Sequence, residues 1–107
     1  MVGRLKNPET DRLFKAILQL DSIEECYAFF EDLCTIGEVK SMTQRFQIAR
    51  LLAQGATYAE ISARTGVSTA TISRVNRCLE YGADGYRLIL ERLAVTETDT
   101  EGKEATE

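Results

Sequence analysis

The chain has 107 residues, enough for one small domain with a limited core, and it carries 13 basic and 17 acidic residues for a formal net charge of −4. It contains no histidine, and its three cysteines, Cys26, Cys34 and Cys78, share no CxxC spacing, so we expect neither a zinc site nor a histidine-dependent catalytic site. No apolar run approaches the length that crosses a bilayer, and the first residues lack the basic and apolar blocks of a signal peptide, so we expect a soluble cytoplasmic protein without a membrane partner.

The first half of the chain predicts three helices, each opened by a capping residue and continued by apolar residues at helical spacing. Asn7 followed by Pro8 opens the first helix. Ser22 and Thr35 are each followed three residues later by a glutamate, which is the capping-box spacing, and Gly55 closes the third helix. The predicted helices span about residues 8–20, 22–34 and 35–55. Their apolar faces comprise Leu13, Phe14, Ile17 and Leu18 in the first, Ile23, Cys26, Phe29, Phe30 and Leu33 in the second, and, pointing inward, Val39, Met42, Phe46, Ala49 and Leu52 in the third.

The first two helices carry more apolar surface than a short helical motif can cover, including Phe14, Tyr27, Phe29 and Phe30. This surface either packs on the third helix of the same chain or forms a subunit interface. We predict the second arrangement, a homodimer. The three cysteines fall on or near apolar helical stripes, so we expect them to act as small core residues.

Residues 57–79 predict two short helices joined by a tight turn. Thr57 caps the first helix, with Glu60 three residues on, and Gly66 stands where the chain must turn through a positive φ. Ser68 caps the second helix. The residues expected to pack between the two helices are Ile61, Val67, Ile72 and Val75. The pattern is typical of a helix-turn-helix that reads duplex DNA, whereas the alternative is an ordinary helical hairpin.

The outward face of the second helix is rich in hydroxyl and amide groups, which can meet base edges in a major groove. Ala70 can contact a thymine methyl, and Arg77 can reach guanine or phosphate. Residues 40–77 contain six basic residues and one acidic residue, a net charge of +5, although the chain as a whole is acidic. The predicted DNA-binding residues are Arg64, Ser68, Thr69, Ala70, Thr71, Ser73, Arg74, Asn76 and Arg77.

A short break between Gly82 and Gly85 precedes a last helix, which Asp84 can cap. Residues 96–107 contain five acids and one base, a net charge of −4, and no large apolar residue. We predict a disordered acidic tail there, which either solvates the protein or mimics DNA. The sequence therefore predicts an all-α protein of six helices, with one helical domain over residues 1–95 followed by the acidic tail.

The stretch from Leu33 to Leu93 resembles the tryptophan repressor family, in particular its repressor-like branch from Gram-positive bacteria. The similarity rests on the segments LCTIGEVKSMTQRFQIARLLAQG and ARTGVSTATISR, followed by a terminal helix at the right distance. The resemblance implies an intertwined all-α homodimer, in which the first, second, third and sixth helices build a shared core. The fourth and fifth helices then form the DNA reader, and Ser68, Thr69, Ala70, Thr71 and Ser73 match positions that approach bases or phosphates.

In the founding member of the family tryptophan is the corepressor, and Thr35, Arg45 and Arg74 match three of its ligand positions. The chain departs from that pattern at Val75, where tryptophan-binding repressors have a glycine, and at Cys78, where they have a serine. An isopropyl group can fill the indole slot itself. Tryptophan, another small effector and no effector therefore remain as alternatives, with Thr35, Arg45, Arg74 and Cys78 as the candidate effector residues. Arg45 and Arg74 can equally contact phosphate or pair within the protein.

The sequence thus predicts a dimeric DNA-binding transcription regulator, a repressor, that inserts two copies of the helix from Ser68 to Leu79 into successive major grooves of a palindromic operator. Phosphate contacts are expected from Arg64, Arg74 and Arg77. The preceding helix offers Tyr58, Ala59 and Ser62 where the family offers polar or basic side chains, so its grip on phosphate should be weaker. The alternative function is a protein interaction module that never binds DNA. An enzyme is not expected, and no cofactor is required.

Overall fold

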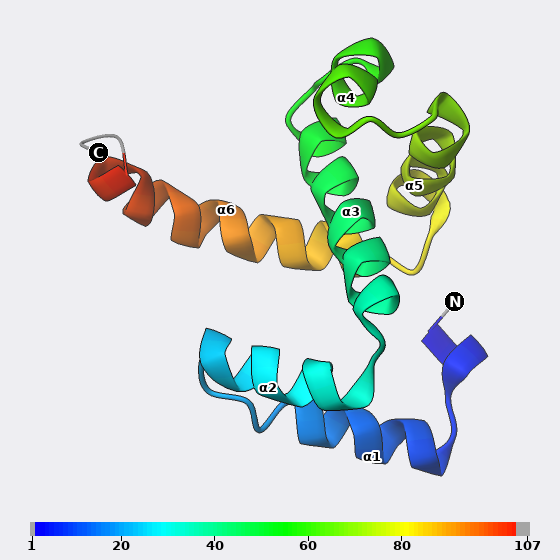
Figure 1. Cartoon of the computed structure of the whole chain (residues 1–107), viewed down its shortest axis with the longest axis vertical. Coiled ribbons are helices and arrows are strands. Elements are labelled where there is room, and N and C mark those ends of the chain that lie inside the picture. The colour runs from blue at the N-terminus through cyan, green and yellow to red at the C-terminus, as the bar shows by residue number, and fades with distance from the viewer. Residues whose placement is uncertain (1, 105–107) are drawn as a thin grey trace. The chain divides into compact units, whose positions relative to one another are not determined.

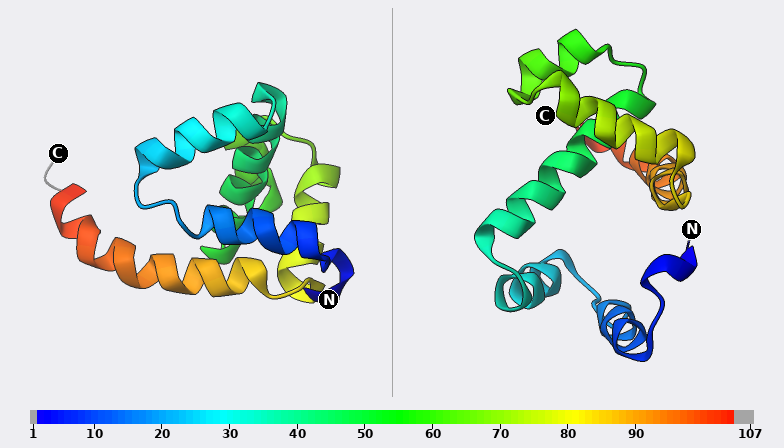
Figure 2. Two further views of the ribbon diagram at one scale, coloured as in Figure 1. Left: turned by 90° about the horizontal axis from the view of Figure 1, so that it is seen from below. Right: turned by 90° about the vertical axis from the view of Figure 1, so that its right-hand side faces the viewer.

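The computed structural model describes residues 2–104, with side chains from Gly3 to Ala94, and shows an all-α chain. A 3-10 turn η1 (Val2–Leu5) precedes six α-helices (Figure 1). These are α1 (Pro8–Ile17), α2 (Ile23–Leu33), α3 (Ile36–Ala53), α4 (Tyr58–Thr65), α5 (Thr69–Tyr81) and α6 (Gly85–Glu104). From residue 2 to residue 104 there is no strand, and the predicted six-helix, all-α architecture is confirmed (Figure 2). None of these described helices is long and apolar enough to cross a bilayer.

The predicted caps form at the starts of the first three helices. The Asn7 side chain accepts a hydrogen bond from the Thr10 N–H at 2.8 Å, and the Ser22 hydroxyl accepts one from the Glu25 N–H at 3.1 Å. At α3 the bonding is reciprocal, because Thr35 Oγ1 accepts from the Glu38 N–H at 3.1 Å while Glu38 Oε1 accepts from the Thr35 N–H at 2.7 Å. Each cap satisfies a backbone donor that a helix start leaves without a partner.

Helix α1 ends earlier than the sequence predicts, at Ile17 rather than about Leu20. The chain tightens after the helix, since the N–H groups of Gln19 and Leu20 bond to the carbonyls three residues back, Ala16 O and Ile17 O. Such i to i−3 bonds are the usual way in which a last turn closes.

The chain divides into two compact units, here called the N-terminal unit (residues 1–44) and the C-terminal unit (residues 45–107). No residue from Gly3 to Gln44 is buried. Large apolar side chains of this unit are exposed instead, and they include Leu5, Phe14, Leu18, Ile23, Tyr27, Leu33, Ile36 and Met42. Met42, which was predicted to point inward, is therefore one of the exposed residues.

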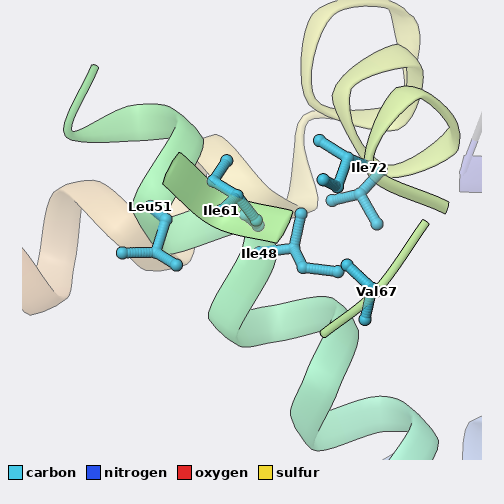
Figure 3. Close-up of a cluster of buried hydrophobic side chains, with 7 residues drawn as sticks. Ile48, Leu51, Ile61, Val67 and Ile72 are labelled. Atoms are coloured by element: carbon cyan, nitrogen blue, oxygen red, sulfur yellow. The ribbon is translucent and has the colours of Figure 1, made fainter. Parts of the chain in front are cut away.

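The core lies in the C-terminal unit, where α3, α4 and α5 bring their apolar side chains together (Figure 3). Its buried residues are Ile48, Ala49, Leu51, Ile61, Val67, Ile72 and Val75. The four predicted for α4, the turn and α5 are confirmed. On α3 the predicted inward face was only partly right, because Ala49 is buried but Phe46 and Leu52 are half-buried, while Ile48 and Leu51 were missed. Helices α4 and α5 meet the later turns of α3, so the buried face is set there by the i, i+3 pair Ile48 and Leu51.

The cysteines do not fill the core, contrary to the prediction. Cys26 and Cys78 are exposed, Cys34 is half-buried, and all three are free thiols. On α5 the inward face continues from Val75 to the half-buried Leu79, four residues on, which leaves Cys78 outside it.

Helix α6 continues through residues 96–104, inside the segment for which the sequence predicts disorder. The predicted disorder of this segment stays a prediction. Glutamate and lysine are good helix formers, so a helix that starts within the fold can propagate through them. Residues 105–107 lie outside the described residues, and the boundary at residue 95 stays a prediction.

Candidate nucleic-acid interface

Helix α4 is fixed at its first turn by Thr57. The Thr57 hydroxyl accepts a hydrogen bond from the Glu60 N–H at 3.1 Å and lies 3.0 Å from Glu60 Oε1, to which it donates. The glutamate was expected to reach back to the cap, and here it contacts the hydroxyl of the capping residue. Because Ile61 in the same turn is fully buried, the start and the rotation of α4 are both determined.

The turn after α4 is held by hydrogen bonds from Ser62 and Thr65, whose roles the sequence pattern does not predict. Gly66 adopts φ +75°, as predicted, and its N–H bonds to Ser62 O at 2.8 Å. The Ser62 hydroxyl donates to Val67 O at 2.8 Å. Thr65 Oγ1 donates to Ile61 O at 2.7 Å and accepts from the Val67 N–H at 3.3 Å. Ser62 and Thr65 therefore shape the turn, and Ser62 has its hydroxyl directed to the protein backbone.

Helix α5 begins with a hydroxyl pair. Ser68 Oγ accepts from the Thr71 N–H at 3.2 Å and lies 3.2 Å from Thr71 Oγ1. Ile72 and Val75 then anchor the helix in the core, and α4 packs against α5. With the start and the inward stripe both fixed, the outward face of α5 is fixed as well.

The side chains opposite that buried stripe are Ala70, Ser73, Arg74 and Arg77, all of them exposed. They recur at i, i+3, i+4 and i+7, so they share one face of the helix. We call these four residues the α5 outer face. Of the other predicted DNA-binding residues, Arg64, Ser68 and Thr69 are exposed, whereas Thr71 and Asn76 are half-buried.

The predicted phosphate ligands carry their charges to solvent. Arg64, Arg74 and Arg77 are exposed and form no ion pair with another described residue. Two ion pairs of the N-terminal unit join Lys6 to Asp11 at 2.8 Å and Arg12 to Glu9 at 3.8 Å. The arginines of the helix-turn-helix are thus available for an anionic partner.

The candidate effector residues fall into different surroundings. Thr35, in the N-terminal unit, caps α3, and its hydrogen bonds, first from the backbone and then from the side chain, lower the pKa of Glu38. The other candidates belong to the C-terminal unit. Arg74 lies on the α5 outer face, whereas Arg45 and Cys78 lie close enough to Tyr86 to affect the pKa of its hydroxyl.

Tyr86, in the first turn of α6, had not been considered as a site residue. It is half-buried and packs against the core cluster that contains Val75. Burial raises the pKa of its phenol above the ordinary value of 10.0, Arg45 acts in the opposite direction, and Cys78 adds to the rise. The neighbouring Arg87 was also missed. Its Nε donates to Leu79 O at 2.9 Å, and its Nη2 donates to Glu80 O at 3.5 Å.

A capped pair of helices joined by a left-handed glycine, with a polar and cationic face on the second helix, defines a helix-turn-helix protein. A family model described as "Trp repressor protein" matches residues 8–94, and the chain belongs to this family. The family is one of DNA-binding transcription regulators, not of enzymes.

Individual relatives support the same assignment. The uncharacterized protein YerC of Bacillus subtilis is 52% identical over 102 residues, which cover 95% of this chain and 98% of that protein. A TrpR-like protein from Eubacterium eligens, whose crystal structure is known, shares 52% sequence identity with this chain. The two structures superimpose with a TM-score of 0.81 over 86% of this chain and 95% of that one. A crystal structure from Staphylococcus aureus, described as that of a candidate Trp repressor, shows 50% sequence identity and a TM-score of 0.82 over 88% of this chain and 94% of that one. These similarities place the chain in the TrpR-like branch that includes YerC.

Proposed function

We propose that this chain is a dimeric, sequence-specific DNA-binding repressor, which inserts α5 of each subunit into the major groove of a palindromic operator. The observation that carries the proposal is the α5 outer face, because Ala70, Ser73, Arg74 and Arg77 share one exposed helix face opposite the buried Ile72 and Val75. A helix anchored along one side and polar along the other is what insertion into a groove requires.

The order of side chains along this face suits such a docking. Ala70 and Ser73 are small, so the N-terminal half of α5 can approach base edges closely. Ala70 offers a methyl group to thymine, and Ser73 offers a hydroxyl that can donate or accept. Arg74 and Arg77 follow one turn later, where longer side chains can reach phosphate or guanine. A good bidentate base contact contributes about 1–3 kcal/mol of discrimination between bases.

The N-terminal unit supports the dimer. A folded unit with no buried residue between Gly3 and Gln44 has too little core to be stable alone. Its exposed apolar side chains flank a groove of about 240 Å³ on α2 and α3. The groove is lined by Ile23, Cys26, Tyr27, Phe30, Glu31, Val39 and Thr43. A second copy of the chain offers apolar helix faces of the same kind, and a two-fold dimer presents two reading helices to two half-sites.

We propose that the protein requires no effector. Val75 is only 3% exposed and belongs to the core, so its isopropyl group occupies interior space next to α5. Tryptophan is therefore not needed for operator binding in this proposal, and Arg45, Arg74, Cys78 and Thr35 have no obligatory ligand role.

The experiment that tests the function is the selection of bound duplexes from fragmented genomic DNA, with and without millimolar L-tryptophan. We expect a palindrome whose half-sites lie about 10 base pairs apart, recovered equally in both arms. Enrichment only with tryptophan would show that an effector is needed after all. No enrichment in either arm would favour the alternative of a protein interaction module.

A charge variant then locates the contact surface on the recovered operator. Arg77→Ala should flatten the dependence of log affinity on log salt by about one unit if Arg77 contacts a phosphate, or relax specificity at one base pair if it reads guanine. Lys15→Ala is the matched control, because it also removes one exposed positive charge, from α1. Equal effects of the two variants would indicate a general charge effect and count against a specific role of Arg77.

A further inference from the structure

The junction between α5 and α6 is built to hold the two helices in one arrangement. The Arg87 guanidinium bonds to the carbonyls of Leu79 and Glu80, in the last turn of α5. At Gly82 any Cβ atom would collide with the carbonyl oxygen of Cys78, so only glycine allows the chain to pass this closely. Asp84 adopts φ +68°, a left-handed conformation that asparagine and aspartate tolerate best after glycine. The first turn of α6 is therefore fixed relative to the reading helix.

Tyr86 extends this junction into the core. Its ring packs on the cluster formed by α3, α4 and α5, and its hydroxyl lies within electrostatic reach of Arg45 on α3 and Cys78 on α5. One aromatic side chain from α6 thus contacts the cluster that positions the reading helix. The ordinary pKa of a phenol, 10.0, already keeps it neutral at physiological pH, and burial raises the pKa of Tyr86 further, so the hydroxyl keeps both its donor and its acceptor.

The arrangement has a consequence for regulation. A small molecule can control a reading helix only if it binds one position of that helix better than another. The interior side of α5 is already occupied by the protein's own Val75, and Tyr86 packs against the core cluster that contains it. We propose that Tyr86 acts as a built-in occupant of the space between α3, α5 and α6, which holds α5 in its DNA-reading position without a soluble effector. This inference rests on the proposed DNA-binding function and specifies its regulation.

The test removes the Tyr86 side chain by mutation and then adds a small phenol that can take its place. Tyr86→Ala should leave a half-open void the size of a phenol ring and weaken operator affinity by at least about tenfold, because α5 is no longer held in one position. Millimolar p-cresol, the small-molecule analogue of a tyrosine side chain, should restore most of that affinity in Tyr86→Ala and leave the wild type unchanged. The readouts are fluorescence anisotropy of the labelled operator, together with circular dichroism and sedimentation.

Tyr81→Ala is the matched control, because Tyr81 is 80% exposed at the end of α5 and its loss should change neither affinity nor the p-cresol response. Unchanged operator affinity in a folded Tyr86→Ala dimer would overturn the inference while the proposed function stands. An affinity loss that p-cresol does not reverse in a folded dimer would also overturn it. If the wild type binds no duplex at all, both proposals are wrong.

A second measurement does not depend on the folding of a variant. Wild-type protein unfolded in guanidinium, dialysed free of small molecules and refolded should bind the operator as tightly as natively purified protein. A loss of affinity that L-tryptophan or a low-molecular-weight cell filtrate reverses would overturn the inference that Tyr86 makes a soluble effector unnecessary.

Discussion

The N-terminal and C-terminal units differ in where their apolar side chains go. In the C-terminal unit, seven apolar residues from α3, α4, the turn and α5 close a core within one chain. In the N-terminal unit no apolar side chain from Gly3 to Gln44 is buried, and many of the large ones are exposed. The comparison shows that the helix-turn-helix forms a core with the later turns of α3, whereas the helices before it leave apolar surface that the described residues do not bury.

The largest expected effect comes from the self-contained core. Ile72→Ala removes a side chain with 0% exposure and should lower the free energy of unfolding by about 2–5 kcal/mol, because it leaves a cavity between the helices of the motif. Ile36→Ala, at 76% exposure in the N-terminal unit, is the matched comparison. Urea titrations at two protein concentrations should show a concentration-independent loss for Ile72→Ala. For Ile36→Ala the smaller loss should depend on concentration, because we place Ile36 at the proposed dimer interface. Equal losses of stability that do not depend on concentration would contradict the difference drawn between the two units.

The next effect concerns the exposed surface itself. Ile23→Asp places a carboxylate in the groove on α2 and α3. It should raise the dissociation constant of the proposed dimer by about 100-fold, since an unpaired charge would be buried on association. Sedimentation equilibrium measures the change, and Ile23→Leu, which conserves volume, should leave the dimer intact. A wild-type chain that sediments as a monomer at every concentration would contradict the role assigned to the N-terminal unit.

A smaller effect separates two glycines of the C-terminal unit. Gly66→Ala forces a side chain into the left-handed turn at φ +75° and should cost about 1–2 kcal/mol of stability. Gly85→Ala is the control, because Gly85 begins α6 and a Cβ there meets no atom within 4 Å, so it should be neutral or slightly stabilising. Thermal unfolding followed by circular dichroism compares the two, and equal melting temperatures would remove the argument for a strained turn.

These residues also show which parts of the molecule sequence patterns can predict. Caps and turns depend on residues three or four apart, so Thr57, Gly66 and Ser68 were predicted correctly, and with them the whole helix-turn-helix. Arg87 reaches a carbonyl eight residues back across a turn, and no local spacing reports such a bond.

The buried face of α3 and the exposure of Cys78 depend in turn on how other helices cross, which periodicity within one helix does not contain. The α5 outer face follows from its own sequence once the helix start is known. The surroundings of Tyr86 could not be predicted, because its neighbours Arg45 and Cys78 come from two other helices.

The smallest expected effect lies in the N-terminal unit, at the capping box of α3. Hydrogen bonds from Thr35 lower the pKa of Glu38 below its ordinary value of 4.5, so the folded state binds this proton more weakly than the unfolded chain does. The stabilisation is then fully present above about pH 4.5 and is lost as the pH falls through the lowered pKa. Glu38→Gln keeps a hydrogen-bonding side chain but cannot titrate. Urea midpoints of the wild type should approach those of Glu38→Gln between pH 5 and pH 3, and parallel curves over that range would show that the cap does not contribute to the acid sensitivity of this unit.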